Sequence, residues 1–294
     1  MDDASGASRT AVLVCQGRAA AHGRLAVDRF SDPIAPVLLR PAEREVVEQV
    51  RAGQPPAGWR DRMAYELVQG CAEMMVPRTV AIDDAVRQRA ADQLVILGAG
   101  LDSRAWRLPE LAGTTVIEVD HPASQADKLD RIGTLAPLAG SLRFAPVRFD
   151  RDELGSALAG AGHDPARPTT WLWEGVVAYL TRGQVRATVA AIRALSAPGS
   201  RLIVNYQQPA VASMLGRVVV WAMLKRGGSH PMAGEPWRSL WTPAALRRLL
   251  ARHGFAVESD ENLIEVAGRL GFELRQRRST RTGRVLVADL SSPA

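Results

Sequence analysis

The stretch that decides the fold is Leu94-Val95-Ile96-Leu97-Gly98-Ala99-Gly100-Leu101-Asp102-Ser103-Arg104. An apolar run of strand length ends in Gly98 and Gly100, and a second apolar run further along the chain ends on Asp120. The two glycines let the backbone turn sharply and approach a ligand without a Cβ in the way. A carboxylate at the end of the second strand is positioned to accept hydrogen bonds from ribose hydroxyls. The pattern therefore predicts a nucleotide-type cofactor site in a doubly wound α/β sheet.

The composition is that of an ordinary globular chain. Its 294 residues suffice for one large α/β domain, and 47% of them are hydrophobic and 23% charged. The net charge is +6, but the basic residues are interleaved with acids, as in Glu43-Arg44-Glu45 and Arg60-Asp61-Arg62. This mixture is typical of a solvated surface, so we expect no nucleic-acid partner.

We expect a cytoplasmic protein without a membrane span or a metal site. Cys15 and Cys71 show no pairing pattern, which indicates free thiols in a reducing compartment. Residues 1–5 are acidic and polar, the reverse of a signal peptide. The long apolar run at 211–224 is shorter than the roughly 20 residues that a span requires and contains Arg217. The chain contains no His-x-x-x-His or Cys-x-x-Cys spacing that would hold a metal.

Residues 1–92 are predicted to form a helical N-terminal cap. Thr10 is expected to cap the first helix, Asp32-Pro33 to begin a second, and Pro41 to begin a third that stops at Gly53. A longer helix is expected from Trp59 to about Val76, ended by Pro77. Its apolar stripe of Met63, Leu67, Cys71 and Met74 or Met75 is typical of a buried face.

Residues 93–294 are predicted to form a Rossmann-like core in the same single domain. The expected strands are 94–97, 115–119, 143–149, 170–173, 201–206 and a closing, antiparallel strand at 284–290. The connections between the first five are long enough for a helix each, which favours a mostly parallel sheet. Residues 207–242 form an insertion longer than usual loops, which we interpret as a lid, with a dimerisation helix as the alternative.

Carboxylates are expected at the ends of three strands, Asp120, Asp150 and Glu174. In an open α/β sheet these ends line one crevice. A nicotinamide dinucleotide would bring a doubly negative pyrophosphate toward three acids, whereas S-adenosylmethionine brings a sulfonium and an ammonium against one carboxylate. An acidic crevice therefore favours S-adenosylmethionine.

The motifs also carry a resemblance to a known family. The segments Leu97-Gly98-Ala99-Gly100-Leu101-Asp102-Ser103-Arg104 and Trp173-Glu174-Gly175-Val176-Val177-Ala178-Tyr179-Leu180-Thr181 resemble the S-adenosylmethionine-dependent leucine carboxyl methyltransferase family. With Arg78-Thr79 before them and Gly234-Glu235-Pro236-Trp237 after them, the chain is similar to its bacterial polyketide O-methyltransferase branch. Ser103 stands where threonine is usual and Trp173 where phenylalanine is frequent.

The resemblance implies a set of cofactor-binding residues. Arg78 would pair with the methionine carboxylate, Gly98, Ala99 and Gly100 would pass beneath the methionine moiety, and Asp120 would hold the ribose. Asp150 with the Arg151 backbone would read the adenine, and Glu174 would lie near the methionine ammonium. The implied fold is that of a class I methyltransferase, with a seven-stranded mixed sheet.

The predicted activity is O-methylation of a small-molecule acceptor, a polyketide-like or other secondary metabolite, by a monomer or homodimer. A carboxylate acceptor is already ionised and needs no base, whereas a phenol needs a general base within hydrogen-bond reach. Candidate catalytic residues are His230 and Tyr179, and together with Trp237 they are candidates for the substrate wall. The alternatives are a nicotinamide-dependent oxidoreductase and a cofactor-binding protein without turnover.

Overall fold

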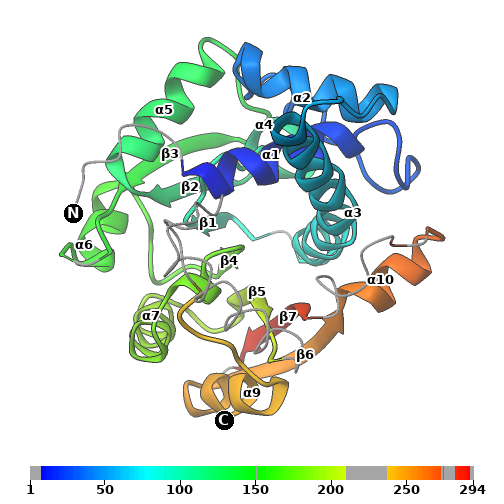
Figure 1. The fold of residues 1–294 in the computed structure, drawn as a ribbon. Helices are drawn as coiled ribbons and strands as arrows, with labels where there is room; N and C mark the ends of the chain where they lie inside the picture. Colours follow the sequence, from blue (N-terminus) through cyan, green and yellow to red (C-terminus); the bar gives the residue numbers. More distant parts are fainter. Residues whose placement is uncertain are drawn as a thin grey trace.

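The protein contains one seven-stranded mixed sheet in the order β3-β2-β1-β4-β5-β7-β6 (Figure 1). The computed structural model describes residues 8–89, 91–149, 151–209, 237–272, 274 and 282–291. The strands are β1 (Gln93–Leu97), β2 (Thr115–Asp120), β3 (Ser141–Pro146), β4 (Thr169–Trp173), β5 (Arg201–Gln207), β6 (Phe255–Asn262) and β7 (Gly283–Leu290). The first five run parallel, and β7 lies antiparallel between β5 and β6.

The strand order reverses at β1, which pairs with β2 on one side and β4 on the other. Leu97 is in register with Val119 of β2 and with Trp173 of β4. The glycine turn after β1, Asp120 at the end of β2 and Glu174 after β4 therefore emerge at one edge of the sheet. In doubly wound sheets, the crevice outside this edge is where ligands bind.

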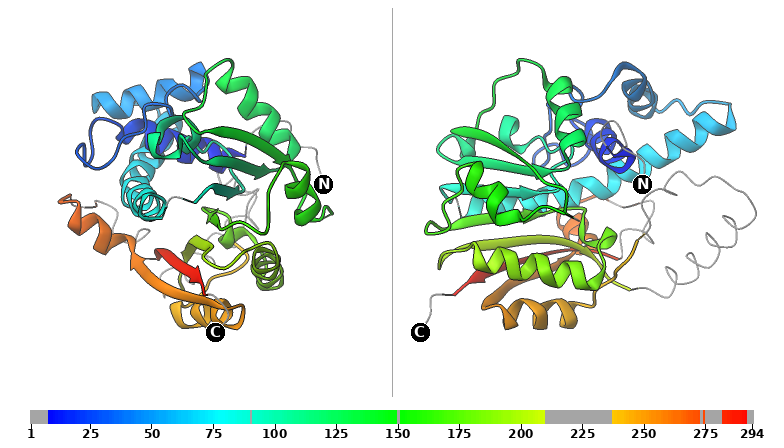
Figure 2. Two further views of the ribbon diagram at one scale, coloured as in Figure 1. Left: turned by 180° about the vertical axis from the view of Figure 1, so that it is seen from behind. Right: turned by 90° about the vertical axis from the view of Figure 1, so that its left-hand side faces the viewer.

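Helices cover both faces of the sheet (Figure 1). They are α1 (Arg9–Ala21), α2 (Pro41–Ala52), α3 (Trp59–Gln88), α4 (Arg104–Arg107), η1 (Pro109–Leu111), α5 (Pro122–Ile132), α6 (Leu154–Gly160), η2 (Val177–Tyr179), α7 (Arg182–Ala194), α9 (Pro243–Arg252) and α10 (Leu263–Arg269). In Figure 1, α3 and α10 lie on one side of the sheet and α6 and α7 on the other, and α1 packs against α3 (Figures 1 and 2).

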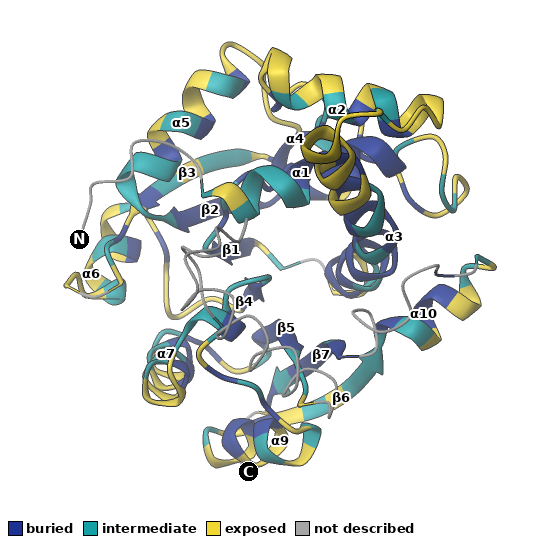
Figure 3. Cartoon of the chain, viewed as in Figure 1, coloured by how far each residue is buried: buried dark blue, intermediate teal, exposed yellow. Residues whose placement is uncertain are grey.

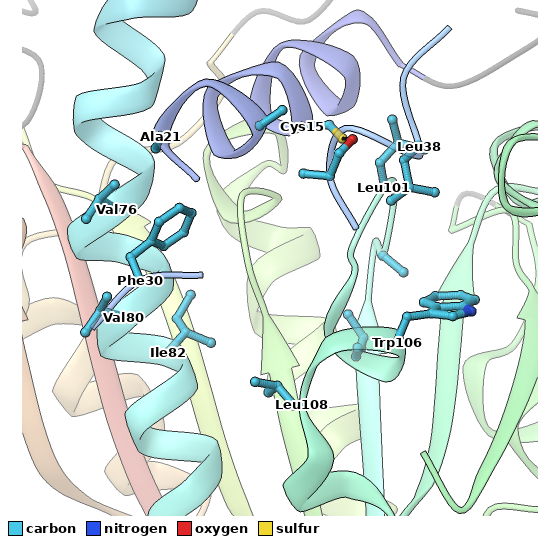
Figure 4. Packing of buried hydrophobic residues seen from close by; sticks show 14 of the residues in the cluster. Cys15, Ala21, Phe30, Leu38, Val76, Val80, Ile82, Leu101, Trp106 and Leu108 are labelled. Atoms are coloured by element: carbon cyan, nitrogen blue, oxygen red, sulfur yellow. Dashed lines mark hydrogen bonds between the residues drawn. The ribbon is translucent and has the colours of Figure 1, made fainter. Parts of the chain in front are cut away.

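Successive residues of β1 point to opposite faces and belong to two separate buried clusters. Leu94 and Ile96 pack with residues of α1, α2 and α3, whereas Val95 and Leu97 pack with residues of α7 and α9. Figure 3 shows the strands buried between exposed helix surfaces. Figure 4 shows Phe30 beside the α3 residues Val76 and Val80, where the N-terminal helices meet the sheet.

Several predicted helix boundaries are confirmed by the structure. Pro41 begins α2, and Gly53 ends it with a left-handed φ of 66°. Two later helices are also capped by threonine: Thr181 forms a capping box with Gln184 at the start of α7, and Thr242 caps α9.

The prediction that Pro77 ends a helix is wrong, because α3 continues through Pro77 to Gln88. A proline inside a helix removes one backbone hydrogen bond, but the helix is buried from Met75 to Val80, and this packing offsets the loss. The predicted buried stripe is also wrong in its first half. Met63 and Leu67 are 42% and 39% exposed, whereas Tyr65 and Val68 point inward.

Two predicted helix caps are also corrected. Ser8, one residue before Arg9, caps α1 in place of Thr10. Asp32-Pro33 begins a turn and not a helix, and the buried Asp32 carboxylate accepts from Ala35 N at 3.0 Å.

The sheet also departs from the predicted strand bounds. β3 occupies residues 141–146, earlier than the predicted 143–149, and β6 has no counterpart among the predicted strands. The second half of β6 reads Glu258-Ser259-Asp260-Glu261-Asn262, which lacks the apolar alternation of a half-buried strand. Most of the predicted lid at 207–242 lies outside the described residues. In the described part of the chain, no helix has the length and apolar character needed to cross a membrane.

Candidate active site

The turn after β1 is built so that only glycine fits at its first position. Gly98 has a φ of 67° and Gly100 a φ of 49°, a region that favours glycine. The Gly98 and Ala99 N–H groups both donate to the carbonyl of Val119, at 2.7 and 3.1 Å. A Cβ on Gly98 would overlap Cγ2 of Val176, so the β4 side of the site closes directly over the turn.

A cavity of about 390 Å³ lies against this turn. Its wall includes Gly98 to Asp102, Asp120, Phe149 and Glu174, together with residues from the first turns of α1. The volume falls within the roughly 300–1,000 Å³ of small-molecule sites. The structure thus brings the glycine turn, Asp120 and Glu174 into one hollow.

Asp120 is anchored by backbone groups on either side of it. One oxygen accepts from Gly100 N, and the other accepts from His121 N at 2.6 Å. Burial raises the pKa of Asp120, and these two hydrogen bonds oppose that rise by favouring the carboxylate. Each oxygen keeps a further lone pair, so the group can still accept hydrogen bonds from a ligand in the cavity.

Glu174 is enclosed by two arginines that the sequence prediction did not connect with it. Arg104 donates from Nη1 to Oε2 of Glu174 at 2.9 Å, and Arg78 Nε lies 2.7 Å from Oε1. Burial opposes the ionisation of Glu174, but Arg104 and Arg78 outweigh it and lower its pKa. Glu174 is therefore an ionised, firmly held carboxylate.

The positive charges at the cavity differ from the electrostatics that the sequence predicted for the crevice. Arg104 also pairs with Asp102, and Arg18 and Arg78 line the cavity beside Asp102 and Glu174. The prediction of an acidic crevice is wrong: besides the predicted Arg78, Arg18 and Arg104 bring positive charge to this edge, so that acidic and basic groups are balanced there. Sequence spacing could not show this balance, because Arg18 and Arg78 reach the site from distant helices.

Arg78 has the bonding capacity of an anion-binding residue. Its side chain is 9% exposed, and Glu174 is its ion-pair partner within the described part of the chain. Among the described residues, the Arg78 Nε has no hydrogen bond that meets the required geometry. A guanidinium carries five N–H donors, so this buried group lines the cavity with N–H groups available for an anion.

A network of buried charges supports the cavity from below. Asp83 of α3 accepts from Arg104 Nε at 2.8 Å and from both terminal nitrogens of Arg107, at 2.6 and 3.0 Å. Asp32 accepts from Arg18 Nε at 2.8 Å and from the Ser103 hydroxyl at 2.7 Å. The N-terminal helices are thereby tied to the segment that follows the glycine turn.

Of the predicted site residues, Arg78, Gly98, Ala99, Gly100, Asp120, Glu174 and Tyr179 line the cavity. Arg151 and Trp237 are not part of its wall, and the Arg151 N–H donates to Arg148 O at 2.9 Å. Asp150 and His230 lie outside the described residues. Within those residues, no group of His, Cys, Asp and Glu side chains is arranged to hold a metal ion.

Comparison with known proteins identifies the family of the chain. Residues 11–193 match the family model described as leucine carboxyl methyltransferase. The chain belongs to this family. The match covers the glycine turn, Asp120, Glu174 and the two arginines paired with Glu174.

Two relatives of this leucine carboxyl methyltransferase family member carry the provisional name S-adenosyl-L-methionine-dependent methyltransferase. The one from Mycobacterium tuberculosis (strain ATCC 25177 / H37Ra) is 33% identical over an alignment of 287 residues. The match covers 86% of this chain and 89% of the relative. The one from Mycolicibacterium gilvum (strain PYR-GCK) is 36% identical over 209 residues, which cover 70% of this chain and 67% of the relative.

A solved structure shares the fold. A provisionally named methyltransferase from Thermobifida fusca YX aligns with a TM-score of 0.58 at 15% identity, over 99% of this chain and 97% of that one. The predicted class I methyltransferase fold is confirmed, and family membership makes S-adenosylmethionine the cofactor. The nicotinamide-dependent alternative is not supported.

Proposed function

We propose that this protein transfers a methyl group from S-adenosylmethionine to an oxygen of a small-molecule acceptor, and that the oxygen belongs to a carboxylate. The product would be a methyl ester of a polyketide-like or other secondary metabolite. The observation that carries the proposal is the shared cavity, in which the glycine turn, Asp120, Glu174 and Arg78 face one another. Family membership supports the same donor.

The residues present fit the donor. The Arg78 guanidinium has N–H groups available for the methionine carboxylate, and Glu174 is an ionised acceptor for the methionine ammonium. Asp120 can accept from the ribose hydroxyls, and the bare glycine turn leaves room for the methionine chain. When bound, the donor supplies a methyl group on a positively charged sulfur.

A carboxylate acceptor agrees with the groups that line the cavity. No histidine occurs among the described residues of the wall, and Glu174 is held ionised by arginines and is therefore a poor proton acceptor. A carboxylate is ionised at neutral pH and needs no base. The acceptor oxygen forms a bond to the methyl carbon while the carbon–sulfur bond breaks. The electron pair of the broken bond stays on sulfur. The opposite charges cancel along this path, which a water-poor cavity favours.

The test is the alkali lability of the product. The protein is incubated with methyl-labelled S-adenosylmethionine and a panel of aromatic and polyketide-like carboxylic acids and phenols. A methyl ester releases labelled methanol in alkali, whereas a phenolic ether does not. Labelled methanol from acids supports the proposal. Alkali-stable label on phenols alone would contradict it and would direct attention to Tyr179 and His230 as candidate bases.

A binding measurement separates the donor from the reaction. We expect S-adenosylmethionine and S-adenosylhomocysteine to raise the melting temperature and NAD to leave it unchanged. Stabilisation by the first two ligands without transfer to any acceptor in the panel would favour a cofactor-binding protein without turnover. Stabilisation by NAD alone would contradict the proposed donor.

A further inference from the structure

One arginine of the cavity wall has no acidic partner within the described parts of the chain. Arg18 donates to Asp32, and Arg78 lies against Glu174, so both are neutralised. Arg238 also lines the cavity, yet among the described residues its guanidinium has no ion pair and no hydrogen bond. Its positive charge is therefore not compensated by a described acidic residue and, besides the N–H groups of Arg78, remains available to a ligand.

The position of Arg238 is fixed by its backbone. The Arg238 N–H donates to Ala178 O at 2.6 Å, and Ser239 donates from N and from Oγ to the carbonyls of Ala178 and Val177, both at 3.2 Å. These carbonyls belong to η2, the turn that follows Glu174 and contains Tyr179. Although its side chain is exposed, Arg238 begins from an anchored point at the rim of the cavity.

The order of the sheet separates Arg238 from the adenosine side. Asp120 ends β2 and Phe149 follows β3, whereas Glu174 and η2 follow β4, on the other side of the glycine turn. A donor held between Asp120 and Glu174 would place its ribose toward β2 and its methionine portion toward β4. Arg238 then lies on the β4 side, near the place where an acceptor would approach the sulfur.

We infer that Arg238 is a specificity-determining residue that binds an anionic carboxylate group of the acceptor. This inference rests on the proposed function, since it assigns the acceptor to the β4 side of the donor. A guanidinium pairs with a carboxylate through two parallel hydrogen bonds, a geometry that neutral groups cannot reproduce. Val176 and Tyr179 beside it offer an apolar and aromatic surface for the rest of the molecule. The expected acceptors are acids with a hydrophobic body.

The experiment compares matched acids and amides on protein saturated with S-adenosylhomocysteine. The probes are benzoate, phenylacetate and 2-naphthoate and their primary amides, and their affinities are measured by calorimetry. We expect the wild type to bind at least one acid tenfold or more tightly than its amide. Arg238→Gln should abolish this preference while leaving the affinity for S-adenosylhomocysteine within threefold. Arg186→Gln, an exposed arginine of α7, makes the same change in net charge and should keep the preference.

Each result has a distinct meaning. If S-adenosylhomocysteine fails to bind the wild type, the proposed function fails. If it binds but no acid is preferred over its amide, or if Arg238→Gln retains the preference, the inference is overturned while the donor assignment stands. A large loss of S-adenosylhomocysteine affinity in Arg238→Gln would also overturn it, because Arg238 would then belong to the donor site.

Discussion

At the scale of single residues, Asp120 offers the most direct test of the donor site. Its two oxygens are oriented by the N–H groups of Gly100 and His121, so the ligand meets a fixed acceptor. Asp120→Ala should weaken S-adenosylhomocysteine binding by about 1.5–3 kcal/mol, the contribution of a hydrogen bond to a charged group. This corresponds to roughly a 10- to 150-fold rise in Kd, measurable by calorimetry. Glu48→Ala, at an exposed position of α2, is the control, and an unchanged Kd in Asp120→Ala would contradict the ribose assignment.

The buried arginines mark the limit of residue-level prediction. The acids Asp120 and Glu174 were predictable because the first ends an apolar strand and the second directly follows one. The buried ion pairs were not predictable, because the Arg104–Glu174 and Arg18–Asp32 pairs depend on how helices pack and on no local spacing. The resemblance indicated Arg78 but gave no sign that it contacts Glu174.

Arg104 is expected to matter more for stability than any exposed arginine. It is 2% exposed and contacts Asp83, Asp102 and Glu174. Arg104→Met would leave these acids without a shared cation, so the free energy of unfolding should fall by about 3–5 kcal/mol, as when one partner of a buried pair is removed. The matched control is Arg62→Met, which breaks an exposed pair with Glu66 and should cost less than about 1 kcal/mol. Equal effects in urea unfolding would show that the network contributes no more than a surface pair.

At the scale of elements, the glycine turn packs closely against Val176, the residue that precedes η2. Gly98→Ala adds a methyl group that overlaps Val176 and forces alanine into a left-handed φ of 67°. We expect a loss of at least about 2 kcal/mol in the free energy of unfolding, from overpacking and backbone strain together. Gly53→Ala has a similar φ of 66° with open space around it, and so measures the strain alone. The double variant Gly98→Ala/Val176→Ala should recover part of the loss, and no recovery would argue against the overlap.

The elements that sequence patterns predicted are those in which packing follows a local period. All six predicted strands exist, because apolar runs bounded by turn residues leave few other solutions. The prediction ended helix α3 at Pro77 because the local sequence shows the lost hydrogen bond. It does not show the buried contacts that offset this loss. Strand β6 was missed because its polar residues serve as partners for other groups, as when Asp260 accepts from Tyr206 and Arg284.

At the scale of the whole molecule, buried ionisable groups make the stability depend on pH in two directions. Burial opposes the ionisation of Asp102, but Arg104 and Lys128 outweigh it and lower its pKa to about 2. The contribution of ionised Asp102 to the free energy of unfolding is present at pH values above the ordinary pKa of an aspartate. It is lost as the pH falls toward 2. Glu118 of β2 behaves oppositely, since burial raises its pKa to about 7 despite the opposing effect of Lys128. The contribution of protonated Glu118 to the free energy of unfolding is present below pH 4.5, the ordinary pKa of a glutamate. It is lost as the pH rises through 7.

The Glu118 effect can be isolated by comparing two pH profiles. Glu118 is fully buried, and Lys128 Nζ lies 2.5 Å from one of its oxygens while the other has no hydrogen-bond partner among the described residues. Glu118→Gln removes the titration but also the partner of Lys128, so its absolute stability should fall. The informative quantity is the difference between the free energies of unfolding of the wild type and Glu118→Gln, measured in urea at steps from pH 4 to 8. Because all other groups titrate in both proteins, we expect the advantage of the wild type to shrink steadily between pH 4.5 and 7 and then level off. Parallel profiles over this range would mean that Glu118 keeps its ordinary pKa in the folded protein.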